Sequence, residues 1–302
     1  MRTFDVMVDS SCDLPEEYIK ANDIKVMPMP FTLNGKEFSD GYWDVISGKE
    51  YYDAMRTGGV AATSQVNPDV FLKKFKEYAE QDKELLVVAL SGGLSGTYQS
   101  GVTALEELKE THPDCKIYVV NSLTATIGHG LTVMMAIKKG EEGASAAEAA
   151  EWIAQKTKNV FSFFTVDDLM YLHRGGRLSK MSAMAGSLLG FKPILNVKSD
   201  GTLILREKAR GRKTSLETLV THMKRCVKPG DKMDTVVISH GDCEQDAEWL
   251  AARVRESFDV RDVVVMLMGP VISAHVGPGV IAMFFEGDML RTEYEEKYYE
   301  GK

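Results

Sequence analysis

Two short segments rich in hydroxyl and glycine residues could together bind an anion. Residues 91–100, SGGLSGTYQS, follow the apolar run ELLVVAL, where a strand should turn into a helix. A glycine-rich turn at that place exposes backbone N–H groups at the start of a helix, and Ser95 adds a hydroxyl donor. Residues 63–68, TSQVNP, place Thr63 and Ser64 before a second helix. Either segment alone is typical of a helix cap, but both at one edge of a sheet would converge on a single ligand.

The glycine-rich turn does not match the common nucleotide or hydrolase signatures. The dinucleotide spacing G-x-G-x-x-G is absent from SGGLSG, and no lysine follows Gly96 as a P-loop requires. The nucleophile elbow G-x-S-x-G fails because its second glycine comes one residue early. The six histidines fall singly, so we expect no metal site. Two interpretations stay open: a binding site for a small anionic group, and an acyl hydrolase that would use Ser95 with His275.

One histidine and a basic stretch add further candidates. His275 lies in SAHVGPG, where we expect a flexible loop, and a protonated imidazole there could donate to a carboxylate or an acyl phosphate. Residues 174–213 hold ten lysines or arginines against two acids, in a chain whose net charge is -8. This excess indicates either a solvated face or a surface that docks an anionic partner. The candidate docking residues are Arg174, Arg177, Arg210 and Arg212.

Length and composition limit the class of protein. The 302 residues, 44% of them hydrophobic, suffice for one large domain or two with proper cores. The longest apolar runs are too short to span a bilayer, and the N-terminus lacks the pattern of a signal peptide, so we expect a cytoplasmic protein. The four cysteines form no C-x-x-C pair, which argues against a disulfide scaffold. The negative net charge argues against nucleic acid as the main partner.

Apolar strands alternate with amphipathic helices along the chain, which predicts an α/β fold. The N-terminal part is typical of a mainly parallel sheet with flanking helices, and Asp13 is expected to cap the helix that follows DSSCDLP. After about residue 160 the pattern restarts, with a hairpin that turns at Asp200-Gly201 and a mixed sheet. We therefore expect an N-terminal α/β domain at 1–160, a C-terminal α/β domain at 161–288 and an acidic tail at 289–302.

Seven motifs occur in the order found in the DegV family, which this chain resembles over residues 3–285. They are DSSCDLP, TSQVNP, SGGLSGTYQS, HRGGRLS, LLGFKPIL, RGRK and SAHVGPG. The family includes the fatty-acid-binding subunits of bacterial fatty acid kinase. The resemblance implies two α/β domains that enclose one long-chain fatty acid, such as palmitate, between them. It also implies an ATP-dependent fatty acid kinase as partner, transient contact with a membrane surface, and no cofactor other than the bound lipid.

The resemblance further implies which residues hold the lipid. The carboxylate would be bound by Thr63 and Ser95, with Ser64 and Gly96 beside them and His275 near the head group. The segment MSAMAGSLLGF, residues 181–191, is predicted as a helix of methionines and small residues, which either packs as ordinary core or lines an adaptable apolar slot. Burying a C16 tail at about 0.8 kcal/mol per methylene would give on the order of 10 kcal/mol. The expected protein is then a carrier that presents a carboxylate to the kinase, and the alternative remains the hydrolase.

Overall fold

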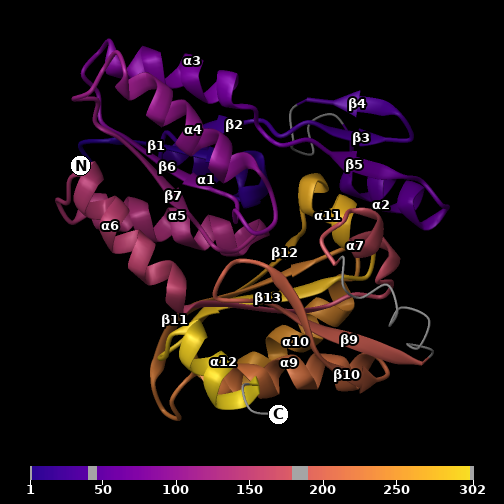
Figure 1. Ribbon diagram of the computed structural model, residues 1–302. Coiled ribbons are helices and arrows are strands. Elements are labelled where there is room, and N and C mark those ends of the chain that lie inside the picture. The colour runs from indigo at the N-terminus through magenta and orange to yellow at the C-terminus, as the bar shows by residue number, and fades with distance from the viewer. Residues whose placement is uncertain (1, 40–45, 179–189, 300–302) are drawn as a thin grey trace.

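The computed structural model describes residues 2–39, 46–178 and 190–299. Its N-terminal part contains a parallel sheet with the strand order β2-β1-β6-β7 (Figure 1). The strands are β1 (Asp5–Asp9), β2 (Lys25–Met27), β6 (Leu85–Ala89) and β7 (Ile117–Asn121). All five residues of β6, LLVVA, are buried, as expected for a central strand covered on both faces.

Helices cover both faces of this parallel sheet. Figure 1 shows α3 and α4 on one side of it, and α5 and α6 on the other. The bounds are α1 (Glu16–Ala21), α3 (Pro68–Ala79), α4 (Thr97–Lys109), α5 (Thr126–Glu141) and α6 (Ala146–Lys156). Helix α3 begins with Pro68 at its first position and buries Phe71, Leu72 and Phe75 on one stripe, as its apolar period predicts.

The C-terminal part is built on a mixed sheet with the order β10-β9-β8-β13-β11-β12. The strands are β8 (Val160–Thr165), β9 (Phe191–Val197), β10 (Leu203–Arg210), β11 (Lys232–His240), β12 (Asp259–Leu267) and β13 (Ile281–Glu286). Strands β11 and β12 pair in parallel, and the other neighbours are antiparallel. The prediction of an α/β protein with one parallel and one mixed sheet is therefore confirmed.

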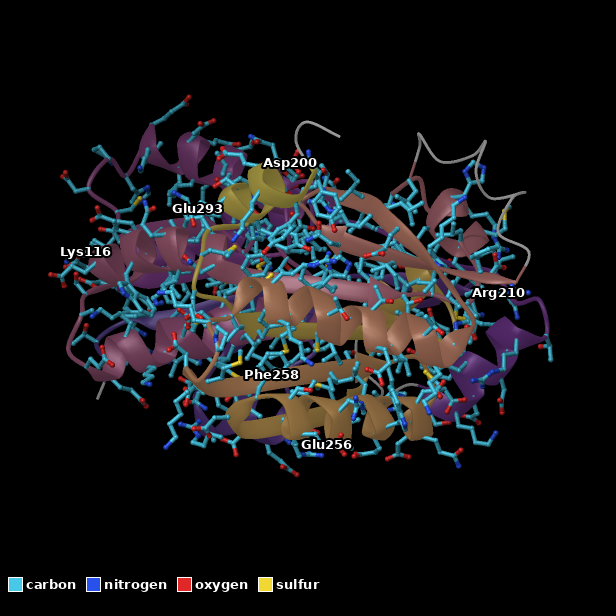
Figure 2. The ribbon with its side chains drawn as sticks, turned by 90° about the horizontal axis from the view of Figure 1, so that it is seen from below. Lys116, Asp200, Arg210, Glu256, Phe258 and Glu293 are labelled. Carbon is cyan, nitrogen blue, oxygen red and sulfur yellow. The ribbon has the colours of Figure 1, made fainter. Side chains whose placement is uncertain are left out.

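The two faces of the mixed sheet have different partners. Helices α9 (Arg212–Cys226), α10 (Glu244–Ser257) and α12 (Arg291–Tyr299) cover the outer face, and Figure 2 shows α9 and α10 side by side across it. Along β8, Phe161 and Phe163 point to these helices, whereas Phe164 joins the core shared with α5 and the parallel sheet. This alternation follows from the two-residue period of a strand. The inner face of the mixed sheet therefore faces the N-terminal part.

A smaller three-stranded sheet completes the fold. Strands β3 (Phe31–Leu33), β4 (Lys36–Phe38) and β5 (Ala61–Thr63) pair in the order β4-β3-β5, and α2 (Gly48–Arg56) packs beside them. Two short helices from the C-terminal part, α7 (Met170–Arg174) and α11 (Pro270–Val276), lie next to this small sheet (Figure 1). Segments that are far apart in the sequence therefore meet at this end of the molecule.

Two local predictions are wrong. Asp13 does not cap α1, which begins at Glu16 after Pro15. It ends a 3-10 turn in the left-handed region, and its carboxylate accepts hydrogen bonds from Thr126 and from the Gly269 N–H. His275 does not lie in a loop but in the last turn of helix α11, because Pro270 starts a helix there.

Of three other expectations, one is changed by the structure and two are not tested by it. The segment predicted as an acidic tail contains helix α12, in which Arg291 and Tyr294 are buried. The predicted methionine-rich helix falls mainly on residues 179–189, outside the described residues. The division into domains at residue 160 stays a prediction.

Candidate ligand-binding site

An apolar cavity lies between the inner face of the mixed sheet and the N-terminal part. The space among its lining side chains is about 730 Å³, a volume that includes part of the open solvent. The sheet and helix α11 supply much of the apolar wall, including Phe164, Val197, Leu203, Val276, Ala282 and Phe284. Such a wall suits a long apolar ligand.

The strand register gives the direction of the cavity. Ala282 lies opposite Phe164, and Phe284 lies opposite Ser162. Val280, Ala282 and Phe284 all line the cavity. Because a strand rises about 3.4 Å per residue, these three side chains mark a wall of roughly 14 Å. The end at Phe284 is called the tail end below. The other end, beside α7 and α11, is called the head-group end.

The head-group end brings together two of the predicted residues. The Thr63 Oγ1 atom lies 2.8 Å from Nε2 of His275, and both residues line the cavity. Gly175 makes room for the imidazole, because a Cβ there would overlap its Nδ1 atom. Burial, followed by the charge of Arg177, lowers the pKa of His275 to about 4. The imidazole is therefore neutral at pH 7.

Ser95 reaches the same cavity from the glycine-rich turn. Its hydroxyl lies 3.0 Å from Oγ1 of Thr97 and accepts from the Thr97 N–H at 3.2 Å, which helps start helix α4. A Cβ at Gly96 would overlap the side-chain amide of Gln65. Gly96 thus allows the TSQ segment to pack against this turn. Gln65 also lines the cavity.

Gly93 of the turn serves a different contact. A Cβ at Gly93 would come within 2.6 Å of the backbone of Gly201, at the tip of the β9–β10 hairpin. Beside it the Ser91 hydroxyl donates to the Gly201 carbonyl at 2.9 Å. The SGG segment therefore joins the parallel sheet to the mixed sheet, and only its continuation, from Leu94, lines the cavity.

Arg177 also lies at the head-group end, although the sequence assigns it to a docking surface. Its Nε donates to the Leu94 carbonyl at 2.9 Å and its Nη1 to the Gly175 carbonyl at 2.5 Å. Within the described ranges no carboxylate forms an ion pair with it, and burial lowers its pKa. The turn that directs it inward uses Gly176, whose φ is +72°. A half-buried guanidinium bonded to two carbonyls can still attract an anion.

The other predicted residues lie farther out. Ser64 is exposed and lies outside the cavity wall. Arg174 is exposed, with its guanidinium 4.7 Å from the centre of the Tyr171 ring. Arg212 pairs with Asp246 at 2.8 Å and with Asp167 at 3.6 Å. Arg210 is exposed at the end of β10, where Figure 2 labels it.

A surface cleft leads to the head-group end. It is lined by Thr63, Arg177 and His275, which also line the cavity, and by Arg174 and part of β5. The structure therefore brings Arg174 and Arg177 together beside the head-group end and leaves Arg212 in ion pairs. Any group held at this end could be reached by a partner through the cleft.

Two expectations about this site need correction. Thr63 and Ser95 do not follow strands of one sheet, because Thr63 ends β5 in the small antiparallel sheet and Ser95 follows β6 in the parallel sheet. Their convergence depends on how the two sheets pack. The serine–histidine pair of a hydrolase is not formed either, because the Ser95 hydroxyl pairs with Thr97 and His275 pairs with Thr63.

The fold and the cavity define a class: an α/β protein with an apolar cavity, partly open to solvent, that ends at hydroxyl and guanidinium groups. Residues 3–288 match the model of the DegV family, described as uncharacterised protein, and the chain belongs to this family. No helix in the described residues is long and apolar enough to cross a membrane.

Three similar proteins illustrate the match. A DegV domain-containing protein of Clostridium perfringens is 39% identical, over 95% of this chain and 99% of that protein. A solved structure from Thermus thermophilus, described as fatty acid binding of a DegV family protein, is 28% identical with a TM-score of 0.84, covering 95% of this chain and 100% of that one. A DegV family protein from Eubacterium eligens, loaded with heptadecanoic acid, is 26% identical with a TM-score of 0.80, covering 94% and 100%.

Proposed function

We propose that this chain binds one long-chain fatty acid, such as palmitate, with the acyl tail in the apolar cavity and the carboxylate at the head-group end. One observation carries the proposal: an apolar cavity ends at two hydroxyl side chains and a half-buried arginine that has no acidic partner in the described part of the chain. The family supports it, because similar DegV proteins are described as binding fatty acids.

The carboxylate would accept hydrogen bonds from Thr63 and Ser95. Neutral hydroxyls donate without a buried counter-charge, and the guanidinium of Arg177 would complement the negative charge. His275 would contribute through Nε2, the atom that now pairs with Thr63. Gly96 acts indirectly, by letting the two hydroxyl-bearing segments pack together. These contacts orient the ligand, whereas burial of the tail provides most of the affinity.

The same geometry supports a carrier that presents its lipid to a kinase in the cytoplasm. The surface cleft would give a partner access to the carboxylate, and Arg174 and Arg177 line that cleft. A kinase bound there would transfer phosphate from ATP to the carboxylate, and the two arginines would attract the acidic or phosphorylated surface of the partner. Arg210 and Arg212 would lie at the edge of the surface that contacts the kinase. The ion pairs of Arg212 would reduce its attraction for the partner.

Native mass spectrometry of the purified protein tests the first part of the proposal. We expect a non-covalent mass of one C14 to C18 fatty acid per chain, which denaturation releases. A protein that carries no fatty acid and takes up no added palmitate would refute the proposal. The kinase step is tested by acyl-phosphate formation with ATP and a cognate kinase. We expect Arg174→Ala to slow it without weakening lipid binding, and added salt to reduce it.

A further inference from the structure

Two adjacent tyrosines of helix α2 are buried although their hydroxyls are polar. Tyr51 and Tyr52 are both fully buried. The Tyr51 hydroxyl donates to the Pro270 carbonyl at 2.9 Å, and the Tyr52 hydroxyl donates to the Met268 carbonyl at 2.9 Å. Burial raises the pKa of both phenols above its usual value, so both hydroxyls keep their protons. Tyr51 therefore connects α2 to the first residue of α11, and Tyr52 connects it to the segment just before this helix.

Helix α11 is the element that carries His275. It contributes Val271, Ile272 and Val276 to the cavity wall as well, so its position sets both the imidazole and part of the apolar lining. The Tyr52 hydroxyl also contacts the Ser273 hydroxyl within this helix. Because α11 has only seven residues, its own hydrogen bonds cannot hold it rigidly. The contacts from α2 supply the missing constraint.

Helix α2 holds the other side of the head-group end too. The Tyr171 hydroxyl, on α7, donates to the Met55 carbonyl on α2 at 3.1 Å. Helix α7 leads directly through Gly175 and Gly176 to Arg177. Thr63 belongs to the small sheet against which α2 packs. Helix α2 is thus the common support of the segments that carry Thr63, His275 and Arg177.

We propose that Tyr51 and Tyr52 are positioning residues that fix His275 relative to Thr63 through α11, and that Tyr171 does the same for the segment leading to Arg177. This inference rests on the proposed fatty acid binding. It goes further by assigning the geometry of the carboxylate site to side chains that do not touch the ligand.

The test replaces each tyrosine by phenylalanine, which keeps the ring and removes the hydroxyl. Affinity is measured for palmitate and for hexadecanol, which has the same chain without the carboxylate. We expect Tyr51→Phe and Tyr52→Phe each to weaken palmitate binding by about three- to tenfold, since each variant loses hydrogen bonding between α2 and the segment that carries α11, and to weaken hexadecanol binding clearly less. Equal losses for both ligands, or none for either, would overturn the inference.

Tyr78→Phe is the matched control. Its hydroxyl donates to the Asp5 carboxylate at 2.9 Å from helix α3, on the far side of the parallel sheet. We expect a comparable change in melting temperature and no change in either affinity. NMR of the ligand-free protein provides a readout that does not depend on binding: the His275 ring resonances should shift in Tyr52→Phe and not in Tyr78→Phe. Unmoved resonances refute the positioning role, whereas a wild-type protein that binds no palmitate refutes only the proposed function.

Discussion

The two ends of the cavity are built in opposite ways. At the head-group end, Thr63, Ser95, Arg177 and His275 come from four separate segments, and hydrogen bonds hold each of them. At the tail end, neighbouring strands supply the wall through side chains that alternate in and out of one sheet. A Cβ at Gly128 would overlap the Phe284 ring, and the Ser162 hydroxyl pairs with that of Thr124 at 2.9 Å, so the tail end is tightly packed.

This difference separates affinity from orientation. The free energy gained by apolar burial has no preferred direction and grows with the area removed from water. The tail end should therefore set how strongly an acyl chain binds and how long that acyl chain can be. Hydrogen bonds require defined distances and angles, so the head-group end should set which chemical group is accepted. Changes at the two ends should therefore have different signatures with an acid and an alcohol of equal length.

The largest effect should come from filling the apolar slot. Ala282→Phe places a ring in the middle of the cavity wall and should exclude about four methylenes, which costs roughly 3 kcal/mol, or about 100-fold in palmitate affinity. Hexadecanol should lose as much, and a C10 acid should lose less. Isothermal titration of the three ligands measures this. The control is Met283→Phe, whose side chain lies in the core of the outer face. Equal affinity in wild type and Ala282→Phe would show that the tail lies elsewhere.

Removing the guanidinium should have the next largest effect. Arg177→Met should weaken palmitate binding by about 2 to 3 kcal/mol, because charge-assisted hydrogen bonds are among the strongest. Hexadecanol binding should change little. Arg174→Met is the matched control, because its side chain is exposed, and palmitate binding should stay within about twofold of wild type. If both arginine variants lose palmitate equally, the attraction comes from the general basic surface.

The sequence points to residues of the head-group end but not to the strands that line the tail end. The segment expected to line an apolar slot, residues 181–191, falls mainly outside the described residues. The wall at the tail end comes instead from β8 and β13, which are nearly continuous apolar runs whose inward-facing side chains no period in the sequence marks. Thr63, Ser95 and His275 come from motifs shared with the family, and all three line one cavity in the structure.

Other contributions depend on contacts that no local pattern records. Arg177 reaches the cavity because Gly175-Gly176 turns the chain back, and Gln65 does so because Gly96 leaves it space. The buried tyrosines of α2 depend on carbonyl groups more than 200 residues away in the chain. Their signal in the sequence is a pair of aromatic residues in a helix rich in charged residues.

Single hydroxyl deletions should have a smaller effect than loss of the guanidinium. Ser95→Ala and Thr63→Ala should each weaken palmitate binding by about 1.5 kcal/mol, since each removes one donor to a charged group. Ser64→Ala is the control and should bind as wild type does, because Ser64 is exposed and outside the cavity wall. Competition with a fluorescent fatty acid measures all three. A double variant with wild-type affinity would mean that the carboxylate is bound by other groups.

The last effect concerns the stability of the protein and not its affinity: it is the pH dependence that His275 contributes to the free energy of unfolding. Its pKa of about 4 in the ligand-free protein is below the ordinary value of 6.5. Between these values the unfolded chain holds a proton that the folded chain does not, so acidification lowers the free energy of unfolding. His275→Gln cannot take up this proton. Wild type should therefore lose stability relative to His275→Gln as the pH falls from 6.5 toward 4, and the difference should be constant above pH 7.

Bound palmitate should reduce this pH dependence. A carboxylate beside the imidazole favours its charged form and raises its pKa toward the ordinary value. Melting temperatures of both proteins at pH 7 and pH 5, with and without palmitate, test this. Hexadecanol gives the matched comparison, since it fills the tail end without a charge at the head-group end and should leave the pH dependence unchanged. If palmitate and hexadecanol change the pH dependence equally, the carboxylate does not lie beside His275. Recognition of the carboxylate at the head-group end would then depend on Arg177 and the hydroxyls alone.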